Sequence, residues 1–121
     1  MYTKEDLFNF EKLIIWGNAR KFIAGIYNIT DNFPDKEKFG LSSQTQRSSV
    51  SVATNLAEGS ERYSQKEFTR YIEISYSSLT ETLSHAYVAY DRKYISEDKL
   101  DTIKEVVKKT SNKLNSLNNS L

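Results

Sequence analysis

The stretch Ser48-Ser-Val-Ser-Val-Ala-Thr-Asn-Leu-Ala-Glu-Gly59 decides how this chain of 121 residues folds. Its apolar side chains are small and recur at helical spacing, with serines beside them. The side chains expected to face the core are Val52, Ala53, Leu56 and Ala57. Because small residues let a neighbouring helix approach closely, we expect a tightly packed helix here. It should run from Ser42 or Ser43, both good N-caps, to about Glu58, with Gly59 just beyond its end.

The segment before this stretch carries an apolar stripe that alternates steps of four and three residues. The stripe consists of Ile15, Ala19, Phe22, Ile26, Ile29 and Phe33. This spacing predicts a helix over about residues 5–31. Thr3 and Asp6 have the spacing of a capping box at its start, and Pro34 disfavours helical backbone at the residue before it. Residues 32–40 are then expected to form a loop.

Two more helices are expected in the second half of the chain. The first opens with the capping box Ser64-Gln-Lys-Glu67 and reaches about Arg92. The second opens at Ser96, and its apolar stripe continues to Leu121. Because short connections make consecutive helices antiparallel neighbours, we expect an all-α, antiparallel up-down-up-down four-helix bundle, a single domain over residues 1–121.

Composition excludes several classes of protein. The chain has 17 Lys and Arg against 16 Asp and Glu, a net charge of +1, and no cysteine. The absence of cysteine excludes disulfide frameworks, thiolate zinc sites and cysteine nucleophiles. The N-terminus is charged and the longest apolar run is only Leu13-Ile-Ile-Trp16, so we expect no signal peptide and no membrane span, and a cytoplasmic location.

One pair of side chains has a spacing suited to acid–base or metal chemistry. Glu81 and His85, the single histidine, are four residues apart and would share one helix face. The alternative is an ordinary polar pair, because neither a second set of ligands nor a nucleophile accompanies them. We therefore expect no enzyme, no cofactor, no metal site and no small-molecule substrate.

Polar residues line one face of the second expected helix and continue just beyond it. They are Arg47, Ser51, Asn55, Glu58 and Arg62, in steps of four, four, three and four. The third expected helix offers Ser75, Ser78 and Glu81 at matching spacing. We interpret these residues as a hydrogen-bonded seam between helices or between subunits, because such networks specify register.

Basic residues gather on the last expected helix, where the candidate nucleic-acid contacts are Lys104, Lys108, Lys109 and Lys113. The alternative interpretation is a solvated outer face, which ordinarily carries such charges.

Tyrosine is abundant, with eight residues in the chain. A second stripe on the third expected helix consists of Tyr76, Leu83, Tyr87, Tyr90 and Tyr94. Tyrosine is enriched at protein interfaces, so packing in the core or between subunits is one interpretation, and stacking of nucleic-acid bases is the other.

These residues resemble a known family, the four-helix-bundle proteins of the 23S rRNA intervening-sequence type. The resemblance covers about residues 8–90 and is most specific in the run from Arg47 to Gly59. The other matching positions are Trp16-Gly-Asn-Ala19, Tyr27, Phe33-Pro34, Phe39-Gly-Leu-Ser-Ser-Gln44, Arg62, Ser64, Phe68 and Ser77-Ser-Leu-Thr-Glu81.

The resemblance implies a small cytoplasmic bacterial protein that forms a ring-shaped homopentamer and has no catalytic residues. Some members of this family are encoded inside intervening sequences of large-subunit rRNA genes and are catalogued as ribosomal proteins. A related branch serves diversity-generating retroelements and binds nucleic acid and a reverse transcriptase. An RNA or a ribonucleoprotein is therefore the expected partner. Since that branch is strongly basic and this chain carries only +1, the alternative is a protein-interaction scaffold with no nucleic-acid role.

Overall fold

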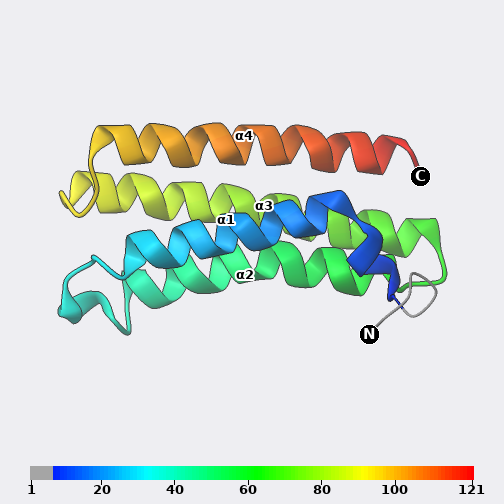
Figure 1. The fold of residues 1–121 in the computed structure, drawn as a ribbon, viewed down its shortest axis with the longest axis horizontal. Coiled ribbons are helices and arrows are strands. Elements are labelled where there is room, and N and C mark those ends of the chain that lie inside the picture. Colours follow the sequence, from blue (N-terminus) through cyan, green and yellow to red (C-terminus); the bar gives the residue numbers. More distant parts are fainter. Residues whose placement is uncertain (1–6) are drawn as a thin grey trace.

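Four long helices run side by side, as Figure 1 shows for the computed structural model, which describes residues 7–121. They are α1 (Ile14–Thr30), α2 (Leu41–Ser60), α3 (Gln65–Asp91) and α4 (Glu97–Asn119). Two short 3-10 helices, η2 (Asn9–Lys12) and η3 (Asp35–Glu37), lie before α1 and between α1 and α2. No strand occurs in this described part of the chain, and none of its helices is long and apolar enough to cross a membrane.

The chain reverses direction from each long helix to the next (Figure 1). α1 runs from the right of the view to the left, α2 returns, and α3 and α4 repeat the two directions. Each helix contacts the next one in sequence and α4 contacts α1, whereas α1 and α3 lie diagonally across the bundle. The predicted all-α, up-down-up-down bundle is confirmed.

The core is built from the apolar stripes that the sequence predicts, one from each helix. The apolar residues that expose no surface are Ala19, Val52, Leu56, Leu79, Ala89 and Leu114. Burying a leucine-sized side chain contributes about 1.5–3 kcal/mol relative to leaving it in water. The four stripes therefore supply most of the energy that holds the helices together.

The first helix begins later than the sequence predicts. The expected helix over residues 5–31 starts instead at Ile14, because Leu13 has an extended backbone with a ψ of 117°. Glu61, in the turn after α2, accepts hydrogen bonds from the Asn9 side chain at 3.4 Å and from the Phe10 backbone at 3.4 Å. These long-range bonds hold the chain in the separate helix η2. The predicted Thr3 and Asp6 cap lies outside the described residues.

The second helix is longer at both ends than predicted. It begins at Leu41 after Gly40, so that Ser42, predicted as an N-cap, is a buried residue of the first turn. It ends at Ser60, and Gly59 lies inside the last turn with no left-handed backbone. The prediction of Gly59 as the residue beyond the helix end is therefore wrong. Its missing side chain makes room for α3 instead.

The contact at Gly59 is very close. A Cβ added to Gly59 would lie 2.6 Å from Cβ of Tyr71 and 3.0 Å from Cδ1 of Phe68. Real Cβ atoms almost never lie that close to another atom. A side chain at position 59 would therefore force the contact between α2 and α3 to shift. Gly59 is thus a packing residue that sets the distance between α2 and α3.

The starts of the last two helices agree with the sequence. The Ser64 hydroxyl accepts a hydrogen bond from the Glu67 backbone at 3.1 Å, and the Ser96 hydroxyl accepts one from the Lys99 backbone at 3.2 Å. Each bond satisfies one of the backbone N–H groups that a helix start leaves free. Local chemistry decides both positions, which is why they were predictable.

A side-chain contact joins the two connections at one end of the bundle. The Tyr94 hydroxyl donates to Glu37 Oε2 at 2.8 Å, and the Leu41 backbone N–H donates to Glu37 Oε1 at 3.3 Å. Both bonds favour the charged carboxylate, and the one from Tyr94 contributes most to lowering the pKa of Glu37. The Tyr94 ring also packs on Phe33, with the ring centroids 5.5 Å apart.

Substitution at Gly59 tests the close approach of α2 and α3. We expect Gly59→Ala to lower the free energy of unfolding by about 1–3 kcal/mol, because the new methyl group overpacks the contact with Tyr71. Gly17→Ala is the matched control, since nothing lies within 4 Å of its added Cβ, and it should stabilise the helix by up to about 1 kcal/mol. Urea unfolding measures both values, and an unchanged or raised stability for Gly59→Ala would contradict the assignment.

Candidate functional site

Hydroxyl side chains of α2 and α3 meet in a hydrogen-bonded line between the two helices, which we call the polar seam. It consists of Ser48, Ser51 and Asn55 on α2 and Ser75, Ser78 and Thr82 on α3. Ser48 Oγ and Thr82 Oγ1 lie 2.7 Å apart, and Ser78 Oγ donates to Ser51 Oγ at 2.9 Å. The seam therefore joins the helices through side chains.

The seam also reaches the backbone of the facing helix. Ser75 exposes no surface, and its hydroxyl donates to the carbonyl oxygen of Val52 at 2.9 Å. A serine can reach a helical carbonyl across an interface only where the two backbones approach closely. Asn55 supports the line from within α2, because its amide donates to the backbone oxygen and the hydroxyl of Ser51 at 2.8 and 2.9 Å.

The energetic role of the seam is to specify register. A hydrogen bond within the protein contributes about 0.5–1.5 kcal/mol to the free energy of unfolding. A buried hydroxyl without a partner lowers it by about 1–3 kcal/mol. A shift of α3 along α2 would break several of these bonds at once. The seam thus penalises alternative alignments more strongly than it stabilises the native one.

The predicted seam residues divide into three groups. Ser51, Asn55, Ser75 and Ser78 lie in the seam. Arg47, Glu58 and Glu81 are exposed, and their side chains form no hydrogen bond within residues 7–121. Arg62 lies in the turn after α2.

Arg62 contacts the start of α3 instead of the seam. Its guanidinium group donates to the hydroxyl of Tyr71 and lies 4.9 Å from the centre of that ring. The Tyr71 side chain is the one that approaches Gly59, so this contact stabilises the same crossing. Sequence analysis missed Ser48 and Thr82 as partners, although their helical spacing from Ser51 and Ser78 was an available signal.

A small recess of about 260 Å³ opens on the solvent side of the seam. Glu81 and His85 both line it, together with Arg47 and Ser51. No hydrogen bond joins Glu81 to His85, and His85 Nδ1 is buried without a partner among the described residues. The two side chains share a face, as their spacing predicts, but residues 7–121 contain no cluster of metal-ligating side chains.

The four lysines predicted as nucleic-acid contacts do not form one cluster. All four are exposed on α4. Lys109 and Lys113 line a pocket against α1, whereas the 100° turn per residue places Lys104 and Lys108 on the opposite flank, toward α3. Lys109 Nζ also lies 3.3 Å from Glu105 Oε1.

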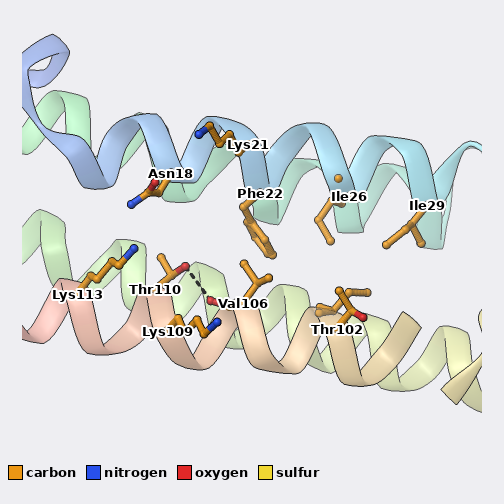
Figure 2. A pocket seen from close by; sticks show the side chains of 12 residues that line it. Asn18, Lys21, Phe22, Ile26, Ile29, Thr102, Val106, Lys109, Thr110 and Lys113 are labelled. Atoms are coloured by element: carbon orange, nitrogen blue, oxygen red, sulfur yellow. Dashed lines mark hydrogen bonds between the residues drawn. The ribbon is translucent and has the colours of Figure 1, made fainter. Parts of the chain in front are cut away.

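An open groove separates α1 from α4, with a volume of about 310 Å³ (Figure 2). Phe22, Ile26 and Ile29 of α1 point into it, facing Val106 of α4 (Figure 2). Its charged residues are Lys21, Lys109 and Lys113. We call this site, together with the pocket that continues it beyond Asn18, the α1–α4 groove.

Sequence analysis missed the α1–α4 groove. The continuing pocket has a volume of about 360 Å³ and is lined by Lys12, Ile14 and Leu117. The available signal was Gly25, because glycine is unfavourable inside a helix. Gly25 lines the groove, and nothing lies within 4 Å of a Cβ built there.

Three of the four tyrosines of α3 are half exposed, not buried. Tyr76, Tyr87 and Tyr90 expose 41%, 40% and 38% of their surface. The other members of the stripe, Leu83 and Tyr94, are partly buried against the core. The tyrosine rings thus lie at the edge of the bundle, where they can still lose surface to a partner.

The fold and the site define a class of protein: an all-α four-helix bundle with a hydrogen-bonded seam between α2 and α3. The chain belongs to the 23S rRNA-intervening sequence protein family, whose model matches residues 11–116. The resemblance noted in the sequence is thereby confirmed. The family's description names no reaction.

A solved structure shows the same fold. The chain is similar to a protein of unknown function from the S23 ribosomal protein family of Bacteroides thetaiotaomicron, with a TM-score of 0.79 and 21% sequence identity. The alignment covers 87% of this chain and 98% of that one. A search of curated proteins finds no match.

A double-mutant cycle tests the seam. We expect Ser48→Ala and Thr82→Val each to lower the free energy of unfolding by about 0.5–1.5 kcal/mol, because each removes the hydrogen bond between the two buried hydroxyls. The double variant should lose about 1 kcal/mol less than the sum, since it removes both partners together. Thr80→Val, at an exposed threonine of the same helix, is the control. Strictly additive losses in urea unfolding would show that the two hydroxyls do not interact.

Proposed function

We propose that this protein is a non-enzymatic, homopentameric helical bundle that associates with RNA or a ribonucleoprotein in the bacterial cytoplasm. The observation that carries the proposal is the family match over residues 11–116, because the family is described by its connection to 23S rRNA. The pentamer comes from the resemblance to ring-forming members of the family.

Exposed apolar side chains support self-association. On α3 the exposed fractions are 41% for Tyr76, 40% for Tyr87 and 45% for Val88. Ile14 at the start of α1 exposes 83%. Aromatic and aliphatic side chains in such positions gain free energy when a partner covers them, and tyrosine is enriched in subunit contacts.

Repetition in a ring would support RNA binding by a chain of low charge. One chain carries a net charge of only +1, which attracts phosphate weakly. Lys104 and Lys108 are exposed on one flank of α4, and five copies would present this pair five times around the ring. Linked weak sites bind one long ligand far more tightly than a single site does.

The chemistry of the seam supports a non-enzymatic role. Catalysis by a hydroxyl needs a base that removes its proton. The Thr82 hydroxyl donates to the Ser78 carbonyl oxygen at 2.8 Å, and the Ser48 hydroxyl lies 3.0 Å from the Thr45 carbonyl oxygen in the geometry of a donor. The histidine nearby, His85, bonds neither of them. The hydroxyls therefore serve structure.

A protein-interaction scaffold without a nucleic-acid role is the second candidate. The near-neutral net charge favours it, because a protein partner needs no excess of positive charge. The two candidates share the pentamer and differ in whether RNA binds.

The mass of the protein in solution tests the pentamer. We expect sedimentation equilibrium at micromolar concentration to give five times the chain mass of 14.0 kDa. Native mass spectrometry provides the independent count of subunits. A monomer in both measurements would refute the proposed oligomer.

Titration with structured rRNA fragments over a range of salt concentrations tests the RNA partner. The affinity should fall as salt rises, and Lys104→Gln with Lys108→Gln should flatten the slope of log K against log salt by about one unit for each phosphate that these lysines neutralise. Lys36→Gln with Lys66→Gln, which removes two exposed lysines elsewhere, is the matched control. Absence of binding at low salt would leave the scaffold as the function.

A further inference from the structure

The α1–α4 groove combines an apolar floor with charges of one sign. The two pockets that form it are lined by Lys12, Lys21, Lys109 and Lys113, and by no aspartate or glutamate. Lys109 contacts Glu105 outside the lining, but this exposed pair is of a kind that contributes little to stability. Four ammonium groups therefore border a groove whose apolar lining is exposed at Ile14 and Val106 and buried at Phe22 and Ile26.

The outer ridge of α3 has the opposite character. We define it by the exposed residues Ile74, Ser77, Glu81, Ser84 and Val88, which follow one another in steps of three and four. Ile74 and Val88 expose 40% and 45% of their surface. Between Tyr71 and Asp91 the chain has no lysine or arginine, and its acidic residues there are Glu73, Glu81 and Asp91. The middle of the ridge is thus narrow and acidic, with apolar side chains at Ile74 and Val88, and Arg70 and Arg92 flank it one turn beyond each end.

We infer that the α1–α4 groove of one copy receives the outer ridge of α3 from the next copy. The inference deepens the proposed function and rests on it, since it assigns the surface through which the oligomer forms. Opposite charges on two apolar surfaces are the pattern that selects and orients a partner at an interface. The occupant is therefore a second copy of this chain.

The dimensions of the two surfaces agree. The groove follows α1 from Ile14 to Ile29, a length of about 22 Å, and the ridge from Ile74 to Val88 is about 21 Å long. Serines at the middle of the ridge keep it narrow enough to enter a channel. On the facing side, Gly25 brings no side chain into the groove, and nothing lies within 4 Å of its Cβ position.

The positions of the two surfaces allow a closed assembly. α1 and α3 lie on a diagonal of the bundle, so the groove and the ridge are on different sides of one subunit. Each copy can then use its groove for one neighbour and its ridge for the other. Such a head-to-tail contact forms a ring when the rotation between neighbours closes, and one self-complementary patch would instead form a dimer.

Charge reversal on each surface tests the contact. Lys109→Glu with Lys113→Glu reverses the groove, and Glu73→Lys with Glu81→Lys reverses the ridge. We expect each pair to weaken assembly at least about tenfold in concentration, because like charges then face each other. All four substitutions in one chain should restore assembly, since the charges are complementary again and the net charge stays at +1. Sedimentation velocity measures the distribution, and circular dichroism verifies that each variant is folded.

Controls separate this contact from the proposed function and from general charge effects. Lys36→Glu with Lys66→Glu makes the same change in net charge as the groove reversal, at exposed positions outside the two defined surfaces, and should leave the mass unchanged. A wild-type monomer would refute the proposed oligomer itself. Suppose that the wild-type protein is an oligomer. The inferred contact alone is then overturned if both reversals leave the mass of the assembly unchanged, or if both weaken the assembly and their combination does not restore it.

A small amphiphile is the competing occupant of the groove. Dansyl-labelled undecanoate, an anionic fluorescent probe, should not bind to the assembled wild-type protein, because the ridge covers the groove there. It should bind to the dissociated ridge variant, whose groove is intact and uncovered. Stoichiometric binding to the assembled wild-type protein would show an open groove and overturn the inference.

Discussion

The close approach of α2 and α3 is the constraint on which the rest of the structure depends. Three features require it together: Gly59 faces the Tyr71 side chain, Ser75 reaches the Val52 carbonyl oxygen, and the hydroxyls of the polar seam pair across the interface. None of these contacts would survive a larger separation of the helices. Small side chains thus determine the distance between α2 and α3, and hydrogen bonds determine their alignment.

The same choice of side chains explains why the bundle is asymmetric. Where α2 and α3 meet through serines and a glycine, α1 and α4 meet through long aliphatic and aromatic side chains and leave an open groove. Phe22 and Val106 both border that groove, and Gly25 of α1 adds no side chain to it. The tightly packed side determines how α2 and α3 align, and the open side retains surface that can bind a partner.

Local patterns in the sequence were sufficient for the four helices, and for the caps at Ser64 and Ser96, because each depends on residues within one or two turns. The start of α1 was not predictable in this way. It depends on Glu61, about fifty positions from the Asn9 and Phe10 groups that it binds. The candidate site was also predictable only in part. The spacing of polar residues indicated part of the polar seam. The groove was missed because periodicity within single helices carries no information on the gap between α1 and α4.

The net charge of the whole chain, +1, gives little indication of what individual regions of its surface can bind. Charges of opposite sign lie in separate regions. The charged residues that line the α1–α4 groove are all lysines, and those along the middle of α3 are all acidic. Electrostatic selection acts over distances of about 10 Å in physiological salt, and a partner therefore meets one patch at a time. Lys104 and Lys108, on the other flank of α4, remain outside the groove. A nearly neutral chain can thus offer distinct surfaces to a protein and to a nucleic acid.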